Sequence, residues 1–94
     1  MTKRQAIAAH ALQGLLYHNQ RYPMASLATA ATEFADKLLT VTDSGESPIS
    51  AREEIASLAL SALICNDPYQ EGSQRTNIAR EAVALADAVL AAAS

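Results

Sequence analysis

The sequence is poor in residues that cross-link a protein or fill its core with bulk. It has one cysteine, one phenylalanine, three tyrosines and no tryptophan in 94 residues. The single cysteine, Cys65, excludes an internal disulfide and agrees with a reducing compartment. Because 21 residues are alanine, which buries little apolar area, we expect a thin core. Burial against a second copy or against another protein would supplement it.

Positive charge and long apolar runs are also scarce. Seven Lys and Arg stand against ten Asp and Glu, a formal net charge of −3. This balance disfavours nucleic-acid binding, because phosphate backbones are contacted by clustered cations. No apolar run approaches the roughly 18 to 20 residues that a membrane span needs. The first residues lead into a polar-interrupted helix rather than a signal peptide. We therefore expect a cytoplasmic protein without a membrane partner.

One stretch of the chain occurs twice. Six residues between Arg4 and Leu15 recur between Arg52 and Leu63 at an offset of 48. Five residues between Ala28 and Leu39 recur between Ala79 and Leu90 at an offset of 51. The Arg, Ile, Leu and Asp matches carry this comparison, because matches between alanines are common in such a sequence. The pattern predicts an internal duplication.

The duplication predicts a single domain, 1–94, with repeats at about 2–41 and 50–93 and a linker at 42–49. Apolar residues at helical spacing predict two helices in each repeat. The expected helices begin near Lys3, near Pro23, which suits the first turn of the second helix, after Ser50 and near Gln74. They end near His18, Val41, Cys65 and Ala92.

Start signals support two of these helices. Thr2 is a suitable N-cap for the first helix. Ser50, followed three residues later by Glu53, forms a capping box for the third helix. Gly14 in the first helix indicates either a close helix crossing or simple tolerance of glycine.

The second and fourth helices each carry an expected apolar face. In the second, large residues lie beside small ones: Leu27, Phe34, Leu38 and Val41 beside Ala28, Ala31 and Ala35. In the fourth, we expect a buried face of Ile78, Ala82, Leu85 and Val89, with Ala79, Ala86 and Leu90 alongside. These faces predict an all-α fold, a four-helix up-down-up-down bundle of two αα-hairpins related by a pseudo-twofold. An orthogonal array of the two hairpins remains the alternative.

The repeated charged residues have an expected structural role. In an antiparallel hairpin, residues equally far from the loop face one another, which brings Arg4 near Asp36 and Arg52 near Asp87. We predict one structural ion pair in each repeat. The alternative is that the two aspartates are catalytic or bind a metal.

Other candidate chemistry is less well supported. His10 and His18 are about two helical turns apart, too far for one metal, and no Glu-x-x-His motif occurs. Glu33 and Asp36 could form an acid–base pair, but the second repeat has Ala84 in place of Glu33. Cys65 lies at a helix C-terminus, where the helix dipole does not favour a thiolate. We expect no enzyme activity, metal or cofactor.

The repeats differ most in their inter-helix loops, and all three tyrosines lie in or beside these loops. Tyr and Arg are enriched among residues that dominate binding energy, and loops on a rigid scaffold often carry recognition. The candidate partner-binding residues are therefore Tyr17, His18, Arg21 and Tyr22 in the first repeat and Asp67, Tyr69, Gln70 and Glu71 in the second. The alternative is that these loops are polar and aromatic by chance.

Three segments carry a resemblance. Met-Thr-Lys-Arg at the start, Ala-x-x-Ala-Leu-Gln-Gly-Leu-Leu from Ala8 to Leu16, and Ala-x-x-Phe-Ala-Asp-Lys-Leu-Leu from Ala31 to Leu39 resemble small accessory proteins of enterobacterial phages and prophages. Those proteins consist typically of one such hairpin, so this chain is similar to a duplicated form. The resemblance implies no particular activity and assigns no functional residue.

Two functions follow as expectations. The favoured one is a non-enzymatic phage- or prophage-type accessory protein that binds another protein and modulates a host or phage factor. The alternative is a homo-oligomeric structural module, with a homodimer as one form, whose exposed Ala and Leu faces meet other copies.

Overall fold

The structure is a computed structural model that describes residues 2–18, 24–43, 48–66 and 73–93. These residues form four helices: α1 (Lys3–His18), α2 (Met24–Thr42), α3 (Ala51–Asn66) and α4 (Ser73–Ala93). The observed helix boundaries agree closely with the predicted ones. The predicted all-α class, a helical bundle of two hairpins, is confirmed. Among the described residues, no helix has the length and apolar character needed to cross a membrane.

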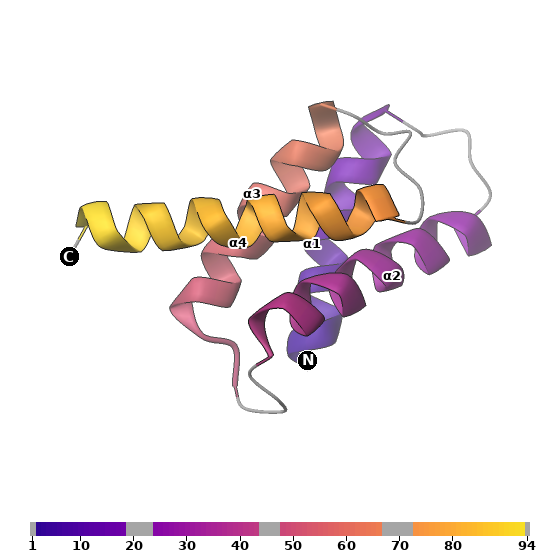
Figure 1. The fold of residues 1–94 in the computed structure, drawn as a ribbon. Coiled ribbons are helices and arrows are strands. Elements are labelled where there is room, and N and C mark those ends of the chain that lie inside the picture. Colours follow the sequence, from indigo (N-terminus) through magenta and orange to yellow (C-terminus); the bar gives the residue numbers. More distant parts are fainter. Residues whose placement is uncertain (1, 19–23, 44–47, 67–72, 94) are drawn as a thin grey trace.

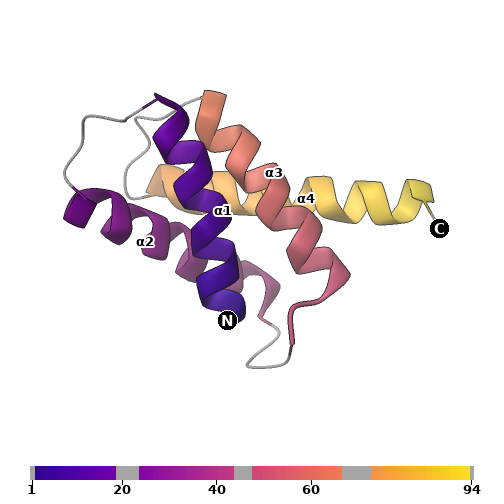
Figure 2. The same ribbon diagram turned by 180° about the vertical axis from the view of Figure 1, so that it is seen from behind.

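The four helices form two layers (Figures 1 and 2). One layer contains α1 beside α3, running in the same direction, and the other contains α2 beside α4. Helices α1 and α2 pack together as the first hairpin, and α3 and α4 as the second. The C-terminal end of α4 extends beyond the other helices (Figure 1).

The predicted pseudo-twofold is wrong. A twofold would bury the same positions in both repeats, but α1 buries Ile7, Ala11 and Leu15, whereas their counterparts 48 residues later are only partly buried. Instead, α3 buries Ala56, Leu60 and Ile64, which lie on the neighbouring side of that helix. The two hairpins thus stack side by side in the same orientation. The face of the first hairpin that forms this contact is therefore a different face from the one that the second hairpin uses.

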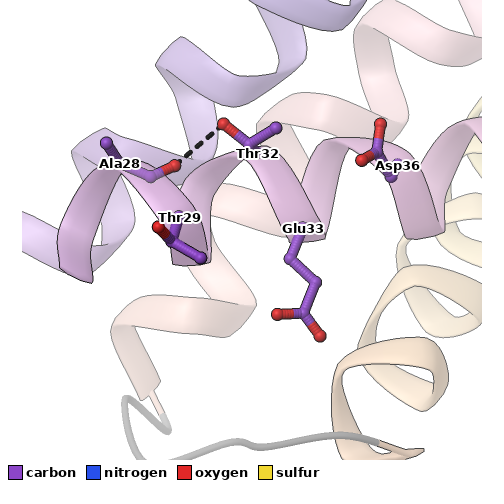
Figure 3. A pocket seen from close by; sticks show the side chains of 5 residues that line it. All are labelled: Ala28, Thr29, Thr32, Glu33 and Asp36. Carbon is purple, nitrogen blue, oxygen red and sulfur yellow. Dashed lines mark hydrogen bonds between the residues drawn. The ribbon is translucent and has the colours of Figure 1, made fainter. Parts of the chain in front are cut away.

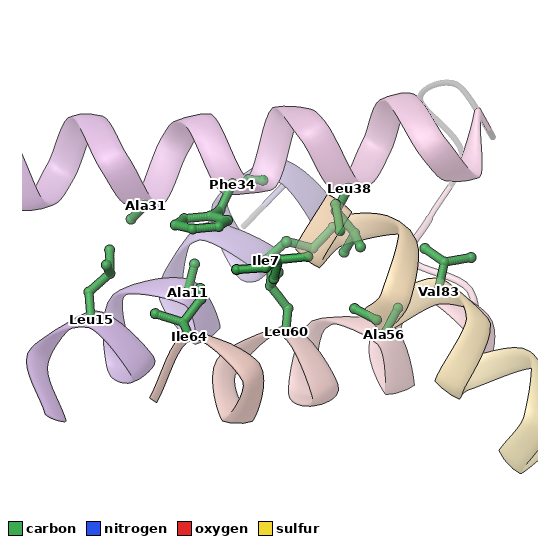
Figure 4. Close-up of a cluster of buried hydrophobic side chains, with 14 of the residues drawn as sticks. Ile7, Ala11, Leu15, Ala31, Phe34, Leu38, Ala56, Leu60, Ile64 and Val83 are labelled. Carbon is green, nitrogen blue, oxygen red and sulfur yellow. The ribbon is translucent and has the colours of Figure 1, made fainter. Parts of the chain in front are cut away.

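The core lies between the two layers and between the two hairpins (Figure 4). Its large, almost fully buried side chains include Ile7, Phe34, Leu38, Leu60 and Ile64. Three pairs of equivalent positions in α2 and α4 are buried in both hairpins: Leu27 and Ile78, Ala31 and Ala82, Ala35 and Ala86.

Two predicted apolar faces require correction. Ala28 is exposed on α2, and Leu85 and Val89 are 44% and 48% exposed on α4. The equivalents of Leu85 and Val89 in the first hairpin are Phe34 and Leu38, which are buried. The difference arises because, among the described residues, the first hairpin has another hairpin beside this face and the second does not. Periodicity identifies an apolar face but not whether a neighbour is present to cover it.

Both α1 and α3 begin with a capping box. In α3, Ser50 N donates to Glu53 Oε1 at 3.1 Å and Glu53 N donates to Ser50 Oγ at 3.1 Å, as predicted. In α1, Thr2 N donates to Gln5 Oε1 at 2.9 Å and Gln5 N donates to Thr2 Oγ1 at 3.1 Å. Each box satisfies backbone donors that a helix N-terminus leaves free. The predicted N-cap role of Thr2 is confirmed, and Gln5 is its reciprocal partner.

Gly14 lies at a close crossing between α1 and α3. A Cβ atom added at this position would lie 2.5 Å from the backbone oxygen of Ser61 and 3.1 Å from Cβ of Ile64. The Cys65 thiol donates to the carbonyl oxygen of Gly14 across the same crossing, with Sγ and O 3.7 Å apart. Of the two interpretations of Gly14, the close crossing is therefore correct, and it joins the two hairpins.

Candidate functional site

The candidate partner-binding residues fall mostly in loops outside the described residues. Tyr17 belongs to α1 and is 72% exposed, and His18 ends the same helix. Neither a position nor a contact is described for the other six: Arg21, Tyr22, Asp67, Tyr69, Gln70 and Glu71. The assignment of the loops as a binding site therefore stays a prediction. The ends of α1 and α3, from which the two loops leave, lie side by side (Figures 1 and 2).

Exposed apolar side chains form a second candidate surface. The described residues include six large ones: Leu16, Tyr17, Met24, Leu58, Leu85 and Val89. Met24 is the most exposed, at 87%. Leu16, Tyr17 and Met24 belong to the first hairpin, and Leu85 and Val89 belong to α4 of the second. Scattered exposed apolar residues are ordinary in a monomer. They indicate a binding surface only where they lie together, and their position relative to the contact between the hairpins is therefore important.

The two predicted Arg–Asp contacts are present, with the same atoms paired in each. Arg4 Nε donates to Asp36 Oδ1 at 2.7 Å and Nη2 donates to Oδ2 at 2.9 Å. Arg52 donates in the same way to Asp87, at 2.7 and 3.0 Å. Each bidentate pair joins the first helix of a hairpin to the second, so it helps to set the register between them.

These contacts also lower the pKa values of the two aspartates. The hydrogen bond from Arg4 lowers the pKa of Asp36 below its ordinary value of 3.8, and that from Arg52 lowers the pKa of Asp87 likewise. A lowered pKa keeps a carboxylate ionised, which suits an ion pair and does not suit a general acid. Since both pairs are largely exposed to water, they contribute little to stability.

Glu53 is a charged side chain that is almost completely buried, at 1% exposure. Lys3 Nζ donates to its Oε2 at 3.2 Å, and Thr42 Oγ1 donates to the same oxygen at 3.0 Å. Ser50 supplies its backbone N–H and its hydroxyl to Oε1. The carboxylate thus ties the start of α1 and the end of α2 to the start of α3. This larger network was not predicted from the sequence, where only the capping box is evident.

Arg75, at the start of α4, makes a second contact between the hairpins. Its Nη1 donates to Glu33 Oε2 on α2 at 2.5 Å, and its guanidinium lies 5.3 Å from the centre of the Phe34 ring. Such a position over an aromatic face is a cation–π contact. Glu33 and Asp36, considered above as an acid–base pair, are therefore each paired with a different arginine. No sequence motif indicated the Arg75 contact.

An open depression lies along α2 (Figure 3). It is lined by Ala28, Thr29, Thr32, Glu33 and Asp36. The two threonine hydroxyls donate to backbone oxygens one turn earlier in the same helix. Because the carboxylates are paired with arginines and the hydroxyls donate within α2, the polar groups of this depression already serve the fold.

The remaining candidates for chemistry lie apart from one another. Cys65 is a free, partly buried thiol at the α1–α3 crossing, and His10 is partly buried on α1. Within residues 2–18, 24–43, 48–66 and 73–93, no group of three or more His, Cys, Asp and Glu side chains could hold a metal ion. Comparisons of the chain with protein-family models, with curated proteins and with solved structures give no match.

Proposed function

We propose that this protein is a non-enzymatic, phage- or prophage-type accessory protein that acts by binding another protein. The observation that carries the proposal is the set of exposed apolar side chains on a small helical scaffold, with Met24 and Tyr17 the most exposed. Aromatic residues and methionine are enriched at the core of protein interfaces, and a few residues, tyrosine among them, carry most of the binding energy. The phage setting and a role in modulating a host or phage factor rest on the sequence resemblance alone.

The cytoplasm is part of the same proposal. It rests on the single cysteine, which suits a reducing compartment. The acidic balance of the chain supports a protein partner over a nucleic acid, because no excess of cations is available to neutralise phosphates. The alternative function, a homo-oligomeric structural module, uses the same exposed apolar residues.

An affinity pull-down from enterobacterial lysate tests the proposal. The baits are the tagged wild-type chain and two variants. Tyr22→Ala/Tyr69→Ala changes the loops, and Leu85→Glu changes the exposed apolar side chains of α4. We expect one near-stoichiometric foreign protein with the wild type, and its loss with one variant identifies the surface involved. Recovery of no foreign protein by any bait would overturn the modulator function and leave the homo-oligomeric module.

A further inference from the structure

The contact between the two hairpins joins one face of the first hairpin to a different face of the second. The positions that form each face occur in both repeats. On the first hairpin the contact uses Gly14, Phe34 and Leu38, and on the second it uses Ile64, Cys65 and Arg75. Figure 4 shows Phe34 and Leu38 directed from α2 toward the side of the molecule where α3 carries Ile64 and Leu60. Each of these residues has a counterpart in the other repeat, at the offsets of 48 and 51 given by the sequence.

The counterparts lie on the two faces of the stack that neither hairpin covers within the described residues. Those of Ile64, Cys65 and Arg75 are Leu16, Tyr17 and Met24, which we call the first outer face. They are 39%, 72% and 87% exposed.

The counterparts of Phe34 and Leu38 are Leu85 and Val89, which we call the second outer face. Together, the two outer faces account for five of the six large exposed apolar residues described. The sixth, Leu58, has His10 as its counterpart and belongs to neither face.

We infer that a second copy of this chain binds head to tail, with its first outer face on the second outer face of the copy before it. The contact would continue the stacking that α1 and α2 already make with α3 and α4. The inference rests on the proposed function in that it assigns the same exposed apolar residues to protein binding. It differs in naming the partner.

The charges at the interface support this occupant. Among the described residues, two ion pairs cross between the hairpins, Lys3 with Glu53 and Arg75 with Glu33. Lys3 and Glu53 correspond to Ala51 and Gln5 in the other repeat. Arg75 and Glu33 correspond to Met24 and Ala84. All four counterparts are uncharged, so at these positions contact between copies buries no unpaired charge, which would be costly.

One position sets a limit on how closely the copies approach. The counterpart of Gly14 is Ala62, which is exposed on α3. A Cβ at the glycine itself would lie too close to the carbonyl oxygen of Ser61. The crossing between copies is therefore wider than the one within the chain. A head-to-tail contact joins two different faces, so it can add copies until a ring closes or a filament forms.

Three matched variants test the inference: Leu16→Glu on the first outer face, Leu85→Glu on the second, and Leu58→Glu as the control. All three residues are exposed leucines on helices, so circular dichroism should show the same helical content for each. Molar mass is measured by sedimentation across concentration. We expect the wild type and Leu58→Glu to rise well above the monomer mass of 9.9 kDa, and each face variant to stay at it.

The decisive sample is an equal mixture of the Leu16→Glu and Leu85→Glu variants. Each retains the face that the other has lost, so the mixture should form a heterodimer of twice the monomer mass and stop there. A mixture that stays monomeric would overturn the head-to-tail contact, because two copies that joined through one shared face would not be rescued.

A wild type that stays monomeric at about 1 mM would also overturn the inference. A Kd of about 1 mM corresponds to an association free energy of only about 4 kcal/mol. A monomeric wild type would leave the proposed function standing if the pull-down recovers a foreign protein. Conversely, a pull-down without a foreign protein would leave the head-to-tail contact intact.

Discussion

Lys3 and Glu53 form an ion pair that joins the start of α1 to the start of α3, 50 residues later in the chain. The side chains are only 8% and 1% exposed. Removing one partner of such a pair costs more than the intact pair contributes, because the remaining charge is left where water solvates it poorly. The pair therefore fixes where the first hairpin meets the second more than it adds stability.

The Glu53→Gln variant should destabilise the protein by about 3 kcal/mol, near the lower end of the effect of breaking buried pairs. Glutamine keeps the capping box through its amide oxygen, as Gln5 does in α1. Its amide nitrogen replaces the oxygen that accepts from Lys3 and Thr42, so the loss reports the charge together with these two hydrogen bonds. Lys3 lies in the first turn of its helix and can turn toward water, which limits the loss. Urea denaturation followed by circular dichroism measures it.

Glu54→Gln is the matched control, because Glu54 is an exposed carboxylate in the same helical turn. It should cost a few tenths of a kcal/mol, roughly the effect of the helix dipole on an exposed charge. A Lys3→Met/Glu53→Gln double variant should recover part of the loss. Equal costs for Glu53→Gln and Glu54→Gln would show that the buried pair does not hold the hairpins together.

Gly14→Ala should destabilise the protein even though alanine favours helix by about 1 kcal/mol over glycine. The new methyl group would meet the backbone oxygen of Ser61, and backbone cannot move aside as a side chain can. Overpacking of this kind costs about 1–3 kcal/mol, so the net loss is expected to be about 1 kcal/mol. Thermal denaturation detects it as a lower midpoint.

Ala62→Gly provides the comparison at the equivalent position of α3. Since Ala62 is exposed, the change should cost only the helix propensity of alanine, about 1 kcal/mol. Compared with glycine, alanine is thus expected to lower the stability of the protein at position 14 and to raise it at position 62. A gain in stability from Gly14→Ala would mean that α1 and α3 do not cross as closely as described.

The sequence predicts the helices and the contacts within a hairpin better than the contacts between hairpins. Capping signals, loop composition and helical spacing act over a few residues, so they locate α1 to α4 closely. The Arg4–Asp36 and Arg52–Asp87 pairs follow from register alone, because α1 and α2 are joined by a short loop, as are α3 and α4. These features depend on local geometry that the chain specifies directly.

The way in which the hairpins stack could not be predicted from periodicity. Phe34 is buried, whereas Leu85, which corresponds to it at the offset of 51 residues, is 44% exposed. Among the described residues, Phe34 has a neighbouring hairpin and Leu85 does not. The roles of Glu53 and Arg75 also depend on that contact. A comparison of the repeats offers one signal: Glu53 and Arg75 are charged where the first repeat has the neutral Gln5 and Met24.

The Arg4–Asp36 pair should give the protein a measurable pH dependence. The pKa of Asp36 is lower in the folded chain than its ordinary value of 3.8, so folding favours its ionised form. This contribution is present above the unfolded pKa and is lost as pH falls through the folded pKa. The difference in unfolding free energy between wild type and Asp36→Asn should therefore shrink as pH is lowered below about 4.

The same comparison in an Arg4→Gln background separates this pair from the other carboxylates. Without the guanidinium, the hydrogen bond that lowers the pKa of Asp36 is absent and only burial, which raises that pKa, remains. The effect of Asp36→Asn should therefore no longer shrink as pH falls. Denaturation midpoints at several pH values give both differences. An acid-dependent difference that persists in the Arg4→Gln background would assign it to another group.

Arg75→Lys should weaken the contact between the hairpins while keeping the charge. Lysine cannot place a flat guanidinium over the Phe34 ring and donate to Glu33 at the same time, so the stacked contact is lost. The expected cost is about 1 kcal/mol, the usual size of a partly shielded cation–π contact. Arg80→Lys, an exposed position on the same helix, should cost almost nothing. Equal effects at the two positions would show that Arg75 serves only as a surface charge and that the α2–α4 contact depends on apolar packing alone.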